Sequence, residues 1–320
     1  MKQLQRILAM ALFGIATLAH AAFPDKPIKI IVGFPPGGPL DTHARLLVDQ
    51  LQKHLGQPVI IDYKPGAGGS IGANEVIKSP ADGYTLLMAN TGTMVINPFV
   101  YTKNIYQTLR DFTPIARTAQ QPLALVVNND VPVKTFKEFV EYAKKNPGKV
   151  NYGSAGNGGI SHLVPEMLQD ALGIQMVHVP YKGTAPAFTD LLGGQVQFMA
   201  ESIPQVGQYL KAGKVRALAM TGRERNSAIP DVPTMAESGV KDFEVVGFYG
   251  VLAPAKLPAE VTAKLTDAFR KTLANEDVRT RMVAQGADPA FLDSAQFAAF
   301  LKTETDRWSA AVKKADVKLD

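Results

Sequence analysis

Three glycine-rich turns stand where binding chemistry could take place, each between a predicted strand and a predicted helix: residues 34–41, 64–72 and 153–161. The first N–H groups of a helix have no partner within it and carry a positive partial charge. Such a helix end can bind an anion without a cationic side chain. Small hydroxyl and amide side chains lie beside these turns: Thr91, Thr93, Ser154 and Asn157. In the simpler interpretation the glycines only form tight turns, but three turns together favour an anion-binding site.

The same turns do not match nucleotide-binding motifs. The chain has no G-x-x-x-x-G-K-[ST] pattern, which excludes a P-loop. Where a dinucleotide-binding fingerprint needs its third glycine, the second turn has Ile71 and the third has Ser161. We therefore predict that the protein works without a cofactor.

One catalytic pattern fits formally. Residues 68–72 read Gly-Gly-Ser-Ile-Gly and match the G-x-S-x-G nucleophile elbow. The elbow needs its serine on a sharp turn directly after a strand, whereas the predicted strand ends near Asp62 and Pro65 intervenes. A secreted serine hydrolase using Ser70 therefore stays as the alternative function, with a histidine base that the sequence cannot assign.

No metal site is predicted, because neither an H-E-x-x-H pattern nor a paired acid–histidine cluster is present. His43 and His54 lie on the first predicted helix, and His178 lies inside an apolar strand, where a core role is expected. His162 follows the third turn at the start of a helix and is a candidate to face a ligand. Asp41 is predicted to cap the first helix, and it could also accept a hydrogen bond from the ligand.

The composition narrows the class of protein. A chain of 320 residues with 46% hydrophobic residues can build about two domains. Its 34 Lys and Arg against 29 Asp and Glu give a net charge of +5, which is mixed rather than polybasic, so no nucleic-acid partner is indicated. The absence of cysteine excludes disulfides, thiolate catalysis, thiolate metal sites and a cysteine-linked lipid anchor.

Residues 1–21 have the pattern of a secretory signal peptide. Lys2 and Arg6 precede an apolar run of about 13 residues, which is too short to cross a bilayer as a helix. Ala19-His20-Ala21 supplies the small-x-small pattern that precedes cleavage. We therefore expect cleavage after Ala21 and export to the periplasm, with no membrane span farther along the chain.

The elements that must position the turns alternate between strand and helix. Residues 28–34 form an apolar, β-branched run, and the helix after residue 41 has apolar residues at spacings of three and four. The same order recurs between residues 123 and 220, and a helical tail covers 258–274 and 294–314. This alternation predicts two α/β units with parallel strands, whose ligand crevice lies outside the carboxyl ends of the strands.

Taken in order, these blocks resemble the Bug family of extracytoplasmic solute receptors, the substrate-binding proteins of tripartite tricarboxylate transporters. The first block is Phe34-Pro35-Pro36-Gly37-Gly38-Pro39-Leu40-Asp41. The other blocks follow along essentially the whole mature chain: residues 65–73, 81–85, 151–154 with Gly156 and His162, 179–183, 190–194 and 230–234. Each block alone is weak evidence, but the ordered set is specific.

The resemblance implies an α/β, two-domain periplasmic-binding-protein fold of type II, with the ligand cleft between the domains. Domain 1 would contain residues 24–122 plus 248–320, and domain 2 would contain residues 123–247. The protein would be a monomeric receptor, not an enzyme, which holds a small carboxylate through backbone amides at helix N-termini and delivers it to membrane permease subunits. The residues expected to bind the ligand are Phe34, Gly38, Asp41, Thr91, Thr93, Ser154, Gly156, Gly158, His162, Lys182 and Glu201.

One departure from the family pattern bears on the ligand. After Val-x-x-Met the family usually has Phe-Asp-Asn, whereas this chain has Ala200-Glu201-Ser202. Glu201 keeps the negative charge but reaches one methylene further, which favours a ligand that also carries a hydrogen-bond donor or an amino group. Di- and tricarboxylates, acidic amino acids and aromatic acids all stay open as ligands, and a sensor kinase stays open as a partner.

Overall fold

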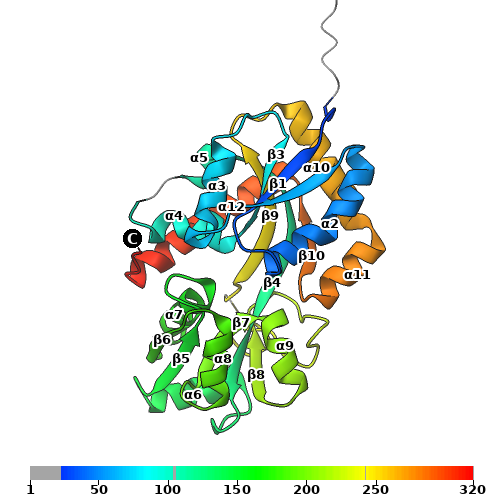
Figure 1. The fold of residues 1–320 in the computed structure, drawn as a ribbon. Coiled ribbons are helices and arrows are strands. Elements are labelled where there is room, and N and C mark those ends of the chain that lie inside the picture. The colour runs from blue at the N-terminus through cyan, green and yellow to red at the C-terminus, as the bar shows by residue number, and fades with distance from the viewer. Residues whose placement is uncertain (1–22, 104–105, 242, 320) are drawn as a thin grey trace, which may run out of the picture.

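Parallel strands joined by helical crossovers build the upper part of the molecule in Figure 1, which we call the first lobe. The computed structural model describes residues 23–103, 106–241 and 243–319. The central strand of this lobe is β1 (Ile28–Val32). It pairs in parallel with β2 (Val59–Tyr63) on one side and with β3 (Thr85–Asn90) on the other. The crossovers are α2 (Pro39–Leu55) and α3 (Ser70–Ile77), as parallel pairing requires.

The second lobe, below it in Figure 1, repeats this arrangement. Its parallel strands are β5 (Val150–Ser154), β6 (Met176–Pro180) and β7 (Phe198–Ser202), with β5 between the other two. A further strand of this lobe, β8 (Val215–Met220), pairs antiparallel with the long strand β4 that is described next. The helices of this lobe are α6 (Phe136–Lys145), α7 (Ile160–Leu172), α8 (Thr184–Leu192) and α9 (Ile203–Lys211).

Two long strands connect the lobes. The first part of β4 (Phe112–Asn128) pairs with β9 (Val246–Pro254), and its last part pairs with β7 and β8. The sequence predicted only residues 123–127 as strand and missed β9. Pro114 and Pro122 interrupt the apolar pattern of β4, and the register of its pairing with β9 shifts beside Pro114 and again after Arg117.

The C-terminal segment returns to the first lobe. It contains α10 (Ala259–Ala274), α11 (Glu276–Ala284), β10 (Asp288–Leu292) and α12 (Ser294–Lys314). The helices predicted at 258–274 and 294–314 are present as α10 and α12, and β10, which lies between them and pairs with β4, was not predicted. Trp308 of α12 is fully buried in a core cluster that continues from the first lobe into the second, to Phe139 and Phe198.

The short elements bring the glycine-rich turns into place. They are η1 (Ala67–Gly69), η2 (Gly92–Ile96), α4 (Asn97–Val100) and α5 (Thr108–Asp111). α2 begins at Pro39 with Gly38 as its N-cap residue, so the prediction that Asp41 caps this helix is wrong. Proline is favoured in the first helical position because its fixed φ suits a helix and its missing N–H is not needed there.

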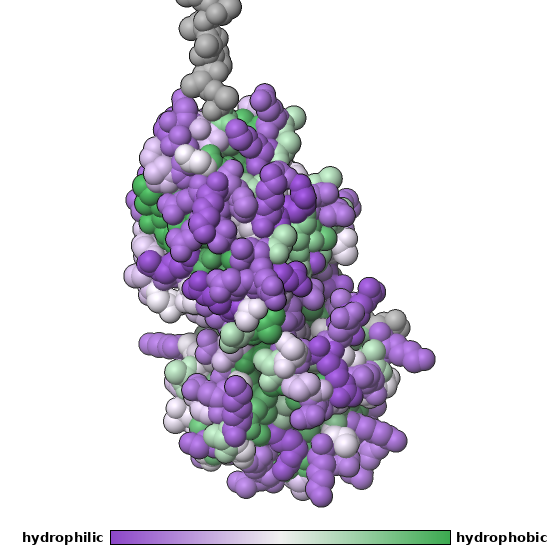
Figure 2. Space-filling model, turned by 90° about the vertical axis from the view of Figure 1, so that its right-hand side faces the viewer, coloured by the Kyte–Doolittle hydropathy of each residue, from purple (hydrophilic) through white to green (hydrophobic). Residues whose placement is uncertain are grey.

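The remaining expectations concern the surface and the N-terminus. Figure 2 shows a mostly hydrophilic face that narrows between the two lobes. No helix within the described residues is long and apolar enough to cross a membrane. The predicted signal peptide, residues 1–21, lies outside the described residues.

Candidate ligand-binding site

Three adjoining cavities lie where β4 and β9 pass from one lobe to the other. We name them the α2 cavity, the hinge cavity and the loop cavity, with volumes of about 290, 100 and 440 Å³. Tyr249 of β9 lines all three, whereas Gln121 of β4 and Asn90 of β3 each line two. The shared residues make the three cavities parts of one cleft.

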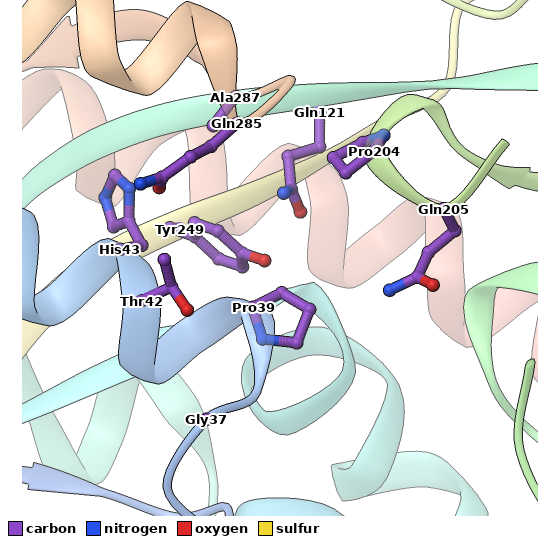
Figure 3. A pocket seen from close by; sticks show the side chains of 10 residues that line it. All are labelled: Gly37, Pro39, Thr42, His43, Gln121, Pro204, Gln205, Tyr249, Gln285 and Ala287. Atoms are coloured by element: carbon purple, nitrogen blue, oxygen red, sulfur yellow. The ribbon is translucent and has the colours of Figure 1, made fainter. Parts of the chain in front are cut away.

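The α2 cavity opens beside the first turn of α2, and Figure 3 shows side chains from both lobes around it. Its walls come from the start of α2, from β4 and β9, from the start of α9 and from the residues after α11. These lining residues are Gly37, Pro39, Thr42, His43, Gln121, Pro204, Gln205, Tyr249, Gln285 and Ala287. Among them there is no Asp, Glu, Lys or Arg, so the cavity presents hydroxyl, amide, imidazole and apolar groups.

The other two cavities flank Asn90 and Tyr249 and are likewise lined by described residues without a formal charge. The hinge cavity is lined by Asn90, Thr91, Gly92, Gln121, Leu123, Ile160, Ser202, Gly247, Phe248 and Tyr249. The loop cavity is lined by Phe34, Pro35, Pro36, Gly38, Pro39, Leu40, Asn90 and Tyr249. Three of the predicted ligand-binding residues, Phe34, Gly38 and Thr91, therefore lie on the cleft wall.

Three helices begin at this cleft. Gly38 and Pro39 at the start of α2, Ile160 at the start of α7, and Ser202 with Pro204 at the start of α9 all line cavities. No side chain makes a capping hydrogen bond at any of these three N-termini. Their positive ends therefore converge on the cleft from both lobes, which favours an anion there.

The three predicted turns differ in how they meet the cleft. The first turn lines two of the cavities, and the third contributes only Ile160. No residue of the second turn lines any of the three cavities. Its amides at Gly69 and Ile71 donate to the Gly66 carbonyl, at 3.0 and 3.5 Å.

Asp41 and Thr93 support the walls from behind. The buried Asp41 carboxylate accepts from the Gly37 amide at 2.7 Å and from the Tyr63 hydroxyl at 2.7 Å, and it pairs with Arg45 at 2.9 Å. Burial alone would raise the pKa of Asp41, but these donors together lower it. The Thr93 hydroxyl lies 3.0 Å from both the Gly68 carbonyl and Asn90 Oδ1, so its one proton can bond to either oxygen. Both side chains thus hold the loops that carry the lining residues.

The predicted residues of the third turn bind one another. Ser154 Oγ is fully buried and lies 2.6 Å from His178 Nε2, while His162 Nδ1 accepts the Gly158 amide at 3.1 Å. The two imidazole rings stack with centroids 3.8 Å apart. Burial lowers the pKa of both histidines, that of His178 to about 4, so the pair is neutral near pH 7. Gly156 donates its amide to Ser154 Oγ at 3.2 Å.

Lys182 and Glu201 do not line the three cavities. Lys182 is exposed. Glu201 is buried at the end of β7, where it accepts from the Thr184 hydroxyl at 3.1 Å and from the Ser202 amide at 2.8 Å. Burial raises the pKa of Glu201, although these hydrogen bonds oppose the shift. Burial also raises the pKa of Tyr249 to about 12, and the Glu201 charge adds to that shift.

Ser70 has no catalytic partner in the described structure. Its hydroxyl lies 3.0 Å from Asn97 Nδ2 and 3.4 Å from the Tyr106 hydroxyl, and no described histidine bonds to it. No group of three or more described His, Asp or Glu side chains could hold a metal ion.

Sequence reasoning missed the residues at the centre of the cleft. Tyr249 and Gln121 lie on β9 and on the undetected part of β4, and Gln205 and Gln285 come from segments with no motif. One signal was available, because Gln120 and Gln121 form a polar pair directly before the buried strand run 123–127.

Solved structures with this architecture are solute-binding proteins. One described as "R. palustris Rpa4515 with adipate" has 32% sequence identity and a TM-score of 0.79, and the match covers 92% of this chain and 99% of that one. Another, "MatC (Rpa3494) from Rhodopseudomonas palustris with bound malate", has 34% identity and a TM-score of 0.74, over 91% and 100% of the two chains. The fold and the cleft therefore define a solute-binding receptor, and the predicted α/β periplasmic-binding-protein fold is confirmed.

The family follows from the sequence comparison. The model of the "Tripartite tricarboxylate transporter family receptor" matches residues 43–317, and the chain belongs to this family. A relative, Protein BugT of Bordetella pertussis, is 35% identical over 321 residues, which cover 98% of each chain. The resemblance to Bug receptors is thus confirmed. The matched family is one of receptors rather than enzymes.

Proposed function

We propose that this protein is a periplasmic receptor that binds a small carboxylate in the cleft between its lobes, through backbone amides at helix N-termini. The convergence of the α2, α7 and α9 N-termini on one cleft carries the proposal, because none of these helices has a side-chain cap. An anion there would meet positive helix ends from both lobes. Adipate and malate, in the two related structures, are carboxylates as well.

The two lobes would act as two domains, residues 24–122 plus 248–320 and residues 123–247, which close on the ligand about β4 and β9. Closure requires only that the ligand bind the closed state better than the open one. Two glycines lie where the lobes contact each other. A Cβ on Gly158 would lie 2.9 Å from Val100, and a Cβ on Gly286 would lie 2.6 Å from Pro204. Both positions therefore need glycine for the lobes to approach this closely.

The predicted ligand-binding residues would divide into two roles. Phe34, Gly38 and Thr91 would contact the ligand directly. The others would hold the walls or act through their charge: Asp41, Thr93, Ser154, Gly156, Gly158, His162, Lys182 and Glu201.

Glu201 would favour a ligand that carries a donor or an amino group, because its buried carboxylate has no cationic partner within the described residues. Glu201→Gln keeps the shape of this side chain and removes the charge. We expect the affinity for aspartate to fall roughly fivefold more than the affinity for succinate, measured by calorimetry. Equal affinity changes for the two acids would contradict this role.

The receptor would reach the periplasm by cleavage after Ala21 and would present its ligand, as a monomer, to membrane permease subunits. A receptor that reports to a sensor kinase would use the same cleft. Deleting the permease genes separates the two roles, since ligand-induced transcription that survives the deletion would favour sensing over transport.

A thermal-shift screen of residues 22–320 against small di- and tricarboxylates, acidic amino acids and aromatic acids tests the proposal. The protein is first denatured and refolded to remove any bound ligand. A ligand at a hundredfold excess over its Kd adds about 2.7 kcal/mol to the free energy of unfolding, which raises Tm by a few degrees in a chain of this size. We expect a shift with one chemical subset of the acids. No shift with any acid would overturn the proposal.

A further inference from the structure

His162 holds the third glycine-rich turn through one hydrogen bond. The Gly158 amide donates to His162 Nδ1 at 3.1 Å, and the His162 side chain is buried. A backbone amide can only donate, so Nδ1 must carry a lone pair and the proton of the neutral ring lies on Nε2. This hydrogen bond therefore exists only while the imidazole is neutral.

Gly158 lies where the two lobes touch. Its φ is +74°, and a Cβ placed on it would lie 2.9 Å from Val100 and 3.4 Å from Val317, which both belong to the first lobe. The backbone of the turn thus packs directly against that lobe. Two residues later, Ile160 begins α7 and lines the hinge cavity. His162 therefore fixes a segment that meets both the other lobe and the cleft.

The ring of His162 lies in surroundings that disfavour a charge. It stacks on His178 with the ring centroids 3.8 Å apart, and the Tyr152 ring lies 4.9 Å from that of His178. Burial lowers the pKa of His162. Protonation of Nδ1 would turn this acceptor into a donor that points at the Gly158 amide, so the hydrogen bond would be lost.

Several other titratable groups lie on the elements around these two rings. Tyr152 of β5 donates its hydroxyl to Glu166 of α7. The Glu166 charge raises the pKa of His162, but burial outweighs it and the pKa stays lowered. The remaining groups bond elsewhere: Asp190 of α8 to Tyr181, Glu201 of β7 to Thr184, Asp170 of α7 to Lys314 of α12, and Asp316 to Lys318 after α12.

The held and the released turn would therefore differ in how readily they take up a proton. In the held turn, burial keeps the pKa of His162 below its ordinary value of 6.5. In a released turn the ring would reach water, and its pKa would return towards that value. Falling pH favours the state that binds the proton more readily, which is the released turn.

On the basis of the proposed carboxylate receptor, we propose that His162 is a positioning residue: its neutral imidazole holds the third turn against the first lobe, and protonation at Nδ1 releases the turn and weakens ligand binding. His162 acts in this way through Gly158, without touching the ligand. The receptor would bind its carboxylate tightly near neutral pH and release it in acid.

A distance between the lobes tests the release without any ligand. The chain has no cysteine, so two introduced cysteines can be spin-labelled specifically. Lys53 of α2 and Lys144 of α6 are exposed on different lobes. In the variant with Lys53→Cys and Lys144→Cys, we expect pulsed EPR to give a longer distance at pH 4.5 than at pH 7. Adding His162→Asn should remove this difference, because Asn Oδ1 replaces Nδ1 with an acceptor that cannot titrate.

Calorimetry with malate, adipate, aspartate and benzoate, on the refolded mature chain, tests the effect on binding. For each acid that binds, the ratio of Kd at pH 4.5 to Kd at pH 7 is compared between variants, so that protonation of the acid itself cancels. We expect this ratio to be about tenfold larger for the wild type than for His162→Asn, since one buried hydrogen bond is lost. His54→Asn changes an exposed histidine and is the matched control, which should keep the wild-type ratio.

The outcomes separate this inference from the proposed function. Equal Kd ratios in the wild type and His162→Asn would overturn the role of His162 and leave the carboxylate receptor intact. An unchanged distance between pH 7 and pH 4.5 would overturn it too, and this measurement needs no variant of His162. A longer distance in acid that persists in His162→Asn would assign the release to another group. If none of the four acids binds at pH 7, the proposed receptor fails, and the effect on binding fails with it.

Discussion

The first and third glycine-rich turns look alike in sequence but use their amides differently. The first turn leaves the α2 N-terminus without a side-chain cap, and its residues line the cleft. In the third turn, side chains of the turn accept three amides: those of Ala155, Gly156 and Gly158 donate to Ser161 Oγ, Ser154 Oγ and His162 Nδ1. A glycine-rich turn therefore does not by itself reveal whether its amides are available to a ligand.

The difference comes from the residues that follow the glycines. In the first turn Pro39 and Leu40 have side chains that cannot accept a hydrogen bond, and among the amides of the turn the Asp41 carboxylate accepts that of Gly37. In the third turn two serines and a histidine can all accept. The first turn thus offers its own residues to an anion. The third turn offers only the α7 N-terminus and is otherwise a support that brings Gly158 against the other lobe.

The largest expected effect comes from placing a charge at the first turn. Gly38 has a φ of −77°, which any residue can adopt, and Gly38→Asp would put a carboxylate at the uncapped end of α2. Repulsion of a bound carboxylate at ~5 Å with an effective dielectric constant of about 20 costs about 3 kcal/mol, so affinity should fall roughly a hundredfold. Calorimetry with the best acid of the screen measures this loss.

Gly38→Asn is the matched control, since it has the same shape and capping ability without the charge. Gly38→Asn should weaken binding only a few fold, which is roughly a tenth or less of the hundredfold loss expected for Gly38→Asp. Equal losses in the two variants would show that shape rather than charge matters at this turn.

A smaller effect is expected from the support turn. Gly158 has a φ of +74°, and a Cβ there would lie 2.9 Å from Val100 of the other lobe. Gly158→Ala should therefore oppose closure and weaken binding about tenfold, in addition to backbone strain of about 1 kcal/mol. Titration calorimetry and Tm separate the two effects.

Gly148→Ala isolates the strain, because Gly148 has a similar φ of +67° with no atom near its added Cβ. It should lower Tm by a comparable amount and leave the affinity unchanged. An equal loss of affinity in both alanine variants would mean that Gly158 does not act through contact between the lobes.

The last effect concerns pH and acts on stability rather than on affinity. His178 has a pKa of about 4 in the folded protein against an ordinary value of 6.5, because burial, and then His162, disfavour its charged form. The unfolded chain therefore binds more protons between these values, and stability is lost as pH falls from 6.5 towards 4, by about 2 kcal/mol for this group. His178→Gln cannot titrate, so its Tm should fall less than that of the wild type between pH 7 and pH 4.5.

His54→Gln changes an exposed histidine and should keep the wild-type pH dependence. If His178→Gln and the wild type lose Tm in parallel, the stacked pair is not the support that we describe.

Much of the fold could be predicted because its signals are local. The runs at β1, β2 and β3 are mostly apolar, and β1, β2 and β5 end in glycine-rich turns, which is the pattern of buried parallel strands. β9 and the first part of β4 could not be recognised in this way. Prolines and glycines interrupt them, and the two segments stabilise each other through pairing between distant parts of the chain.

The sequence by itself determined the α/β class, the family, and the turn at Phe34 and Gly38 that lines the cleft, since these depend on local spacing and on the order of motifs. Only the tertiary structure decided that the N-termini of α2, α7 and α9 meet at one cleft and that Tyr249 and Gln121 form its centre. The physical reason is that a hydrogen bond depends on the distance and direction between two groups. Pairing between distant strands sets that geometry, and no local pattern encodes it.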